Sequence, residues 1–214
     1  MKFEAVIFDL DGVIVSTDEY HYEGWKKLAD DEGIYFDKKI NERQRGVSRM
    51  ESLEVLLEKS DKTYTDEQKN EMAERKNNYY KELLTKLSPD DILPGVMDFT
   101  QKLKEMGVKI AIGSSSKNTP AILKYIGLDK YFNAVADGNQ ITHSKPDPEV
   151  FLLAAKLVGI APEKCLVVED ADAGIEAAKA GGMAALGVGT AEANPNADFK
   201  YKDLAAADID KIFD

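Results

Sequence analysis

Cysteine is scarce in this chain: Cys165 is the single one, so no internal disulfide bond can form. Cys165 opens an apolar run, and we interpret it as a core-packing residue. Long hydrophobic runs are also missing, since none approaches the roughly 18 to 20 residues that span a bilayer. The opening residues, Met-Lys-Phe-Glu, are not typical of a secretory signal. We therefore expect a cytoplasmic protein that does not enter membranes.

Positive charge is the second shortage, with 28 Lys and Arg residues against 39 Asp and Glu, which gives a net charge of −11. Nucleic acids and anionic membrane surfaces select clustered Lys and Arg, so this balance argues against both as main partners. Any phosphate site must then be a local island of positive charge. The 214 residues, 43% of them hydrophobic, suffice for one α/β core with a smaller domain attached.

The most informative segment is Ala5–Val13, where an apolar run stops on two carboxylates, Asp9 and Asp11. Residues at positions i and i+2 of a strand project to the same face. Both acids can therefore lie on one side of a crevice, while Gly12 lets the backbone turn away. One carboxylate can attack a substrate while the other handles a proton. The alternative is an ordinary turn, in which Asp and Gly are common.

Two further apolar runs end in polar residues. Val108–Asn118 passes into a Gly/Ser-rich turn, and Cys165–Asp170 ends on two acids. Ligands bind beyond the carboxyl ends of the strands in open α/β sheets, so we expect the three ends to meet in one crevice. Three such ends favour a catalytic site over unrelated turns.

The combined residues suit phosphoryl transfer. Asp9, Glu169 and Asp170 form an oxygen-only ligand set, which favours Mg²⁺ and lacks the Cys and His typical of zinc sites. Ser114 and the adjacent main-chain N–H groups can donate to phosphate oxygens, close to where the next helix begins. Lys145, on a loop stiffened by proline, supplies a fixed positive charge. The alternative for Lys145 is a solvated surface lysine.

These elements resemble the signature of the haloacid dehalogenase superfamily of phosphotransferases, and the resemblance spans essentially the whole chain. They stand here in order as Asp9-Leu10-Asp11-Gly12, Ser114, Lys145-Pro146 and Glu169-Asp170. The resemblance implies that Asp9 is the nucleophile that forms an aspartyl phosphate and that Asp11 is the general acid/base. Ser114 and Lys145 would bind the phosphoryl group being transferred. The Mg²⁺ ligands that it implies are the Asp9 carboxylate, the Asp11 main-chain carbonyl and Asp170, with Glu169 nearby or acting through water.

Hydrophobic periodicity predicts two units. From about Thr17 to Ser88 the spacing is that of consecutive helices, whereas strands and helices alternate elsewhere. We predict a doubly wound, mostly parallel α/β sheet, the Rossmann-like core of the superfamily, at residues 1–16 and 89–214. An α-helical cap domain is inserted at residues 17–88, and Thr65–Gln68 has the form of a capping box. The two short polar connections between the core and the cap would act as hinges. The strands expected after the cap lie at 108–113, 132–136, 165–168 and 184–187. The segment after Gly189 matches no motif and is assigned only to closing the core.

The cap should select the substrate, because the core supplies generic phosphoryl chemistry. In the segment Arg45-Gly46-Val47-Ser48-Arg49, the Gly and Ser separate two helices and leave two cations at a junction that can reach the crevice. An exposed His or Arg on such a cap is otherwise usually solvated, and Trp25 is more often a core residue.

This cap, together with Ser116-Lys117-Asn118, is similar to that of the sugar-phosphate mutases of the superfamily. The resemblance implies that Arg49 and these three residues hold the non-reacting phosphate of a hexose bisphosphate. His21 and Lys76 would form a hydrogen-bond relay with Asp11. The predicted substrate-binding residues are His21, Trp25, Gly46, Val47, Ser48, Arg49, Ser52, Lys76, Ser116, Lys117 and Asn118, of which Gly46, Val47 and Ser52 line the sugar pocket. One departure is that many relatives carry an Asp at the first hinge, where this chain has Ser16 before Thr17, which concerns hinge energetics and not the chemistry.

A mutase must keep water from its aspartyl phosphate, and a cap that completes the acid/base site only when both phosphates are engaged achieves this. The resemblance therefore implies an enzyme that interconverts β-D-glucose 1-phosphate and glucose 6-phosphate through β-glucose 1,6-bisphosphate. We predict that it is a monomer with hexose phosphates as its partners. Two alternatives stay open: a sugar-phosphate phosphatase of the same fold, and a phosphate-sensing module without catalysis. The intact set of Asp9, Asp11, Lys145 and Asp170 argues against the second.

Overall fold

The computed structural model describes residues 2–44 and 47–214. These residues form a six-stranded sheet with the strand order β3-β2-β1-β4-β5-β6, in which each pair of neighbouring strands is parallel. The strands are β1 (Ala5–Phe8), β2 (Lys109–Gly113), β3 (Ala134–Ala136), β4 (Cys165–Glu169), β5 (Ala184–Gly187) and β6 (Phe199–Lys200). β1 lies between β2 and β4, so the carboxyl ends of these three strands sit side by side. This confirms the predicted α/β fold class.

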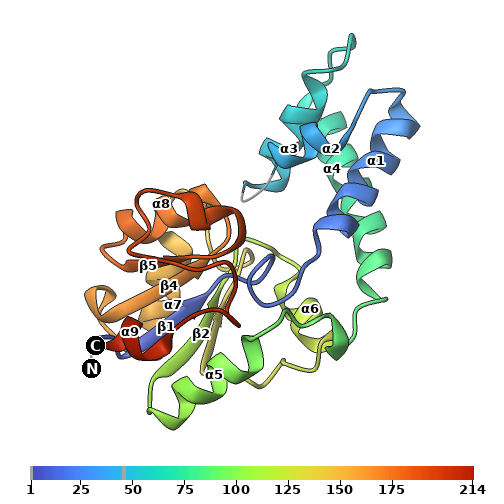
Figure 1. The fold of residues 1–214 in the computed structure, drawn as a ribbon. Helices are drawn as coiled ribbons and strands as arrows, with labels where there is room; N and C mark the ends of the chain where they lie inside the picture. The colour runs from blue at the N-terminus through green and yellow to red at the C-terminus, as the bar shows by residue number, and fades with distance from the viewer. Residues whose placement is uncertain (1, 45–46) are drawn as a thin grey trace.

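Strand β1 shows why the sheet is covered on both faces. Val6 and Phe8 pack into a cluster with the helices α5 (Val96–Glu105), α6 (Thr119–Tyr125) and α9 (Ile209–Phe213). Ala5 and Ile7 point the other way, toward α7 (Glu149–Val158) and α8 (Asp172–Ala180). Figure 1 shows α7 and α8 on one side of the sheet and α5 on the other. Continuous apolar strands are typical of a sheet buried on both faces.

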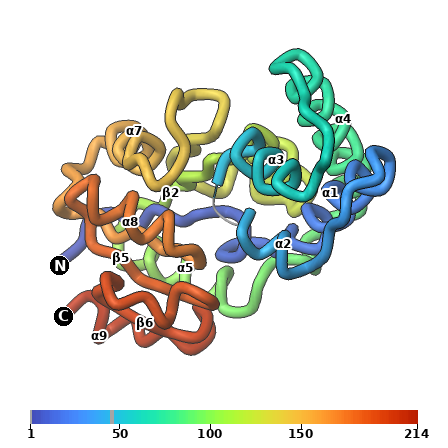
Figure 2. Tube along the Cα trace, turned by 90° about the horizontal axis from the view of Figure 1, so that it is seen from above, coloured from blue at the N-terminus to red at the C-terminus, as the bar shows by residue number. Residues whose placement is uncertain are grey.

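The inserted helices form a unit with its own apolar centre. They are α1 (Asp18–Glu32), α2 (Lys38–Glu42), α3 (Arg49–Leu57) and α4 (Asp66–Leu84). Trp25, Leu28, Leu53 and Met72 are buried together at this centre. The capping box is present as expected, because the Thr65 side chain accepts the Gln68 N–H and the Gln68 side chain accepts the Thr65 N–H. Figures 1 and 2 show these helices standing together at one side of the sheet.

The two chain connections between core and cap lie next to each other. Val15 forms an antiparallel bridge with Ile92, and the Leu93 N–H donates to the Ile14 carbonyl at 2.9 Å. The helices of the insert fall within residues 18–84, inside the predicted range 17–88, and the domain boundaries themselves stay a prediction. No helix among residues 2–44 and 47–214 is long and apolar enough to cross a membrane.

Candidate active site

Asp9 directly follows β1 at the carboxyl edge of the sheet, where its N–H donates to the Val168 carbonyl of β4 at 2.9 Å. The chain then turns at Gly12, whose φ of 84° lies in the left-handed region that favours glycine. A Cβ at this position would overlap the Asp170 carboxylate. The parallel pairing of β1 with β4 places Asp9 and Asp170 at the same edge of the sheet, where the sequence predicts that these strand ends meet.

The acids at the ends of β1 and β4 form a compact oxygen cluster. Asp9, Glu169 and Asp170 are buried, and each offers one carboxylate oxygen such that all three lie within 4.8 Å of one another. Hard carboxylate oxygens at this spacing suit a divalent cation of the Mg²⁺ or Ca²⁺ type. The donor set therefore fits a divalent metal ion.

Lys145 reaches into the same cluster from the loop before α7. Its Nζ lies 2.5 Å from Asp9 Oδ1 and 2.5 Å from Glu169 Oε1, and its side chain is only 3% exposed. Burial alone would lower the pKa of Lys145, but the charges of Asp9 and Glu169 outweigh it and raise that pKa above its ordinary value. Lys145 is thus a permanent cation beside Asp9 and not a solvated surface lysine.

Asp11 lies close to Asp9 but has a different environment. Burial, and then the negative charge of Asp9, raise the pKa of Asp11 to about 7. The Thr17 hydroxyl donates to Asp11 Oδ1, and the Tyr80 hydroxyl donates to Thr17 Oγ1 at 3.0 Å. A carboxyl group that titrates near neutral pH can both give and take a proton, which suits general acid/base catalysis.

His21 of α1 and Lys76 of α4 meet within the cap. His21 Nδ1 lies 2.8 Å from Lys76 Nζ, and the His21 ring stacks on Tyr80 with ring centroids 4.1 Å apart. Burial is the main cause that lowers the pKa of both groups, and the positive charge of Arg49 adds to it. The predicted relay requires this contact between His21 and Lys76. Its link to Asp11 stays a prediction.

The turn after β2 is organised by its own serines. The Ser116 N–H donates to Ser114 Oγ at 3.2 Å, and the Asn118 N–H donates to Ser116 Oγ at 3.2 Å. Asn118 Nδ2 then donates to Oδ1 of Asn77 on the cap helix α4 at 3.0 Å. Both asparagines are buried, so this bond joins the core to the cap next to the site.

A cavity of about 730 Å³ lies between the cap and the carboxyl edge of the sheet. The predicted site residues that line it are Asp9, Asp11, His21, Trp25, Val47, Ser48, Arg49, Ser52, Lys76, Ser114, Ser116, Lys117, Asn118, Lys145, Glu169 and Asp170. Gly46, which is also predicted, lies outside the described residues. Asn77 and Tyr80 also line the cavity, although the sequence assigns them no role in the site. The signal was present in α4, where Ala73, Asn77 and Tyr80 recur at helical spacing with Lys76.

A parallel α/β sheet that carries a buried Asp, Lys and acid cluster beneath a helical insert defines a phosphotransferase of the haloacid dehalogenase type. Residues 3–182 match the family model of the haloacid dehalogenase-like hydrolases. The chain belongs to this family. Membership implies a divalent metal ion, in agreement with the donor set.

Two curated proteins and one crystal structure are similar to this chain over most of its length. The chain is 44% identical to the beta-phosphoglucomutase of Bacillus subtilis (strain 168), over 91% of this chain and 87% of that protein. It is 33% identical to the phosphorylated carbohydrates phosphatase of Thermotoga maritima, over 84% of this chain and 82% of that protein. The crystal structure of beta-phosphoglucomutase from Clostridium difficile superposes with a TM-score of 0.92 at 41% identity, covering 99% of this chain and 96% of that one.

Proposed function

We propose that this chain is a phosphomutase that interconverts β-D-glucose 1-phosphate and glucose 6-phosphate through β-glucose 1,6-bisphosphate. The observation that carries the proposal is a second group of cationic and polar side chains, of the types that bind phosphate, in the cavity that Asp9 and Lys145 line. Arg49 comes from the cap, and Ser116, Lys117 and Asn118 come from the core. A phosphatase needs no second phosphate site. The 44% identity to a beta-phosphoglucomutase supports the same conclusion.

In the first half-reaction, the free hydroxyl of β-glucose 1-phosphate attacks the phosphoryl group carried by Asp9 and gives its proton to Asp11. The bond from phosphorus to the Asp9 oxygen breaks, which forms β-glucose 1,6-bisphosphate and frees the Asp9 carboxylate. In the second half, the bisphosphate reorients and an Asp9 carboxylate oxygen attacks its other phosphorus; the bond from that phosphorus to the sugar oxygen breaks, and this oxygen takes the proton of Asp11 and leaves as the hydroxyl group of glucose 6-phosphate. A pKa of about 7 suits Asp11 to both duties.

Lys145 and Ser114 bind the oxygens of the phosphoryl group while it is transferred. Lys145 Nζ already contacts the attacking carboxylate, so a phosphoryl group on Asp9 would lie beside this cation. We propose Mg²⁺ as the metal, held by the Asp9 and Asp170 carboxylates and the Asp11 main-chain carbonyl, with Glu169 nearby or acting through water. When bound, it would neutralise charge on the transferring phosphoryl group.

The cap would keep water away from the aspartyl phosphate while both ends of the sugar are engaged. Two described hydrogen bonds already join cap and core at the site: Thr17 to Asp11 and Asn118 to Asn77. Closure over a bound hexose bisphosphate would exclude solvent and favour transfer to a sugar hydroxyl over hydrolysis. We also propose that the enzyme is cytoplasmic and works as a monomer. Size-exclusion chromatography would check the monomeric state.

The test incubates the protein with Mg²⁺, β-glucose 1-phosphate and a trace of the bisphosphate, and compares glucose 6-phosphate with free phosphate. The proposal predicts mostly glucose 6-phosphate. Mostly free phosphate would instead support a sugar-phosphate phosphatase, the activity named for the relative that is 33% identical. Turnover of an aryl phosphate would exclude a purely sensing module.

A further inference from the structure

The loop that carries Lys145 is partly exposed and partly half-buried, although the Lys145 side chain is buried. It leads from Thr142 to Pro148 and ends where α7 begins at Glu149. The Lys145 ammonium must stay between Asp9 and Glu169 for its proposed role. Something in the loop must therefore hold it in place.

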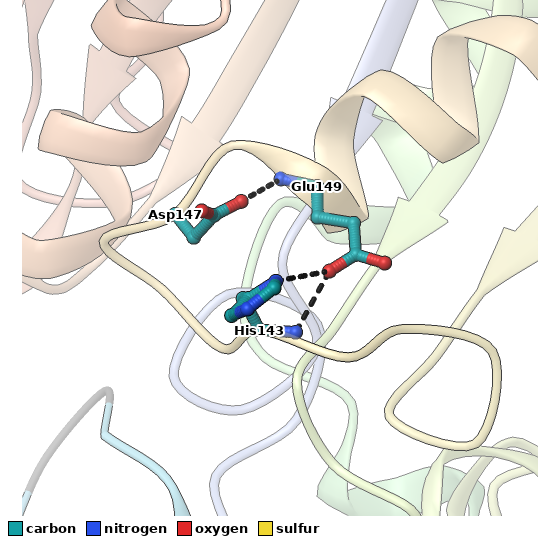
Figure 3. Close-up of side chains that lie close together, drawn as sticks. All are labelled: His143, Asp147 and Glu149. Atoms are coloured by element: carbon teal, nitrogen blue, oxygen red, sulfur yellow. Dashed lines mark hydrogen bonds and ion pairs between the residues drawn. The ribbon is translucent and has the colours of Figure 1, made fainter.

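Glu149, the first residue of α7, closes this loop on itself. Its two carboxylate oxygens each accept the Thr142 N–H at 3.0 Å, and Oε2 also accepts the His143 N–H at 2.7 Å. The His143 ring adds a contact, with Nδ1 3.3 Å from the same oxygen (Figure 3). In return, the Glu149 N–H donates to Asp147 Oδ1 at 2.9 Å. We call the bonds from Glu149 to the Thr142 and His143 N–H groups the Glu149 clasp.

The clasp explains why His143, Asp147 and Glu149 lie close enough together to resemble a metal site. Figure 3 shows that these groups are turned toward each other and toward the main chain of their own loop. The N–H groups of His143 and Thr142 hold the pKa of Glu149 below its ordinary value, so the Glu149 carboxylate stays ionised. We interpret the cluster as a structural closure of the loop and not as a second metal centre.

The other described main-chain contacts of the loop are weaker or more local. The Lys145 N–H reaches Ser115 Oγ at 3.5 Å, the outer limit for a hydrogen bond, and the Asp147 N–H donates to Ser144 within the loop. Charge-assisted bonds such as those of Glu149 are shorter and stronger than bonds between neutral groups. The clasp is therefore the strongest described bond set that fixes the path of the chain on the two sides of Lys145.

We propose that Glu149 is a positioning residue that acts through Lys145: its clasp fixes the loop so that the ammonium group lies where the transferred phosphoryl group binds. This inference rests on the proposed function in assigning Lys145 to that phosphoryl group. It is independent of whether the acceptor is a sugar or water.

The test is a double-mutant cycle of Glu149→Ala and Lys145→Ala, with single-turnover phosphorylation of Asp9 by acetyl phosphate and Mg²⁺ as the readout. In the otherwise unsubstituted protein, Glu149→Ala should slow the phosphorylation of Asp9 by about 10- to 100-fold, because a misplacement of the Lys145 ammonium group by about 1 Å lowers the rate by up to about 10²-fold. In the Lys145→Ala background, the same change should alter the remaining rate by less than about twofold. Effects that multiply in the double variant would overturn the positioning role.

Rescue distinguishes positioning from a general loss of surface charge. Glu149→Gln keeps one side-chain oxygen for the main-chain N–H groups, in weaker neutral bonds, and should recover part of the rate, whereas a simple charge effect would leave it as slow as Glu149→Ala. The matched control is Asp98→Ala, which removes an exposed acid from the first turn of α5 and should not change the rate. If Glu149→Ala does not fold, Glu149→Asp, which is one methylene shorter, takes its place in the cycle.

Two failures can be told apart in this design. An unchanged rate in Lys145→Ala would contradict the proposed function's assignment of Lys145, and the inference with it. If Lys145→Ala slows the phosphorylation of Asp9 but Glu149→Ala does not, only the role of Glu149 would be overturned. Thermal unfolding of each variant shows that the compared proteins are folded.

Discussion

Replacing Arg49 by Ala separates the mutase from a phosphatase of the same fold. Arg49 is the first residue of α3 and lines the cavity, and burial lowers its pKa. The start of α3 does not depend on it, because Ser48 and Glu51 form the capping box. Alanine is also the best helix former. The substitution therefore removes the guanidinium group and leaves the helix in place.

The magnitude follows from the bonds that Arg49 would make to the non-reacting phosphate. A hydrogen bond to a charged group contributes about 1.5 to 3 kcal/mol. At about 1.4 kcal/mol per decade, the loss of one such bond slows the handling of glucose phosphates by roughly 10- to 100-fold. Arg49 also lowers the pKa of Lys76 and His21, so its removal lets both pKa values rise toward their ordinary range.

Two assays are run on the same variant: conversion of β-glucose 1-phosphate to glucose 6-phosphate, and phosphorylation of Asp9 by acetyl phosphate. The first should fall steeply and the second should stay near the unsubstituted rate, because acetyl phosphate has no second phosphate. Arg43→Ala is the matched control, since Arg43 is an exposed cap arginine paired with Glu58 at 2.7 and 2.8 Å. An equal drop in both assays would refute the reasoning and assign Arg49 to the reacting phosphate or to cap stability.

Three further predictions concern the core. Asp9→Asn should abolish turnover in a protein that remains folded by circular dichroism, because the proposed nucleophile and a proposed metal ligand are lost together; retained activity above a trace would exclude Asp9 as nucleophile. Asp11→Asn should slow transfer to sugar by about 10²- to 10⁴-fold, the usual effect of losing a positioned general acid/base. The Mg²⁺ affinity of the Asp11→Asn variant, measured by titration, should persist because the main-chain carbonyl remains. A large loss of Mg²⁺ affinity would instead indicate that the Asp11 side chain is a metal ligand. Cys165 should resist thiol reagents at pH 8 in the folded protein, since burial raises its pKa to about 11, and fast labelling without unfolding would contradict its buried position.

The ends of the central strands were predictable because each is an apolar run that stops on polar residues. β1, β2 and β4 are neighbours in the sheet, and parallel strands bring such ends together. Strand bounds were less accurate at β3, which begins at Ala134 where the periodicity predicts 132. There the Asn133 side chain accepts the Ile110 N–H at 2.9 Å in place of a ladder bond. β6 has two residues, too few to form a pattern.

The parts of the site that sequence analysis missed depend on pairings between distant segments. Helical periodicity assigns Tyr80 to the apolar face of α4, and it is indeed buried. Its hydroxyl, however, donates to Thr17, 63 residues earlier. The bond from Asn118 to Asn77 joins the core to the cap, across 41 residues of sequence. Local patterns state which residues face inward, and only the packing of the insert on the core decides which polar atoms meet.

The central claim is that Asp9 receives a phosphoryl group and passes it to a sugar hydroxyl while water is excluded. The most direct measurement prepares the enzyme with a radiolabelled phosphoryl group on Asp9, adds β-glucose 1-phosphate, and follows the label through one turnover. The account predicts that the label appears in the hexose bisphosphate, and that Asp9→Asn takes up none. Label released mainly as inorganic phosphate in the presence of the sugar would contradict it.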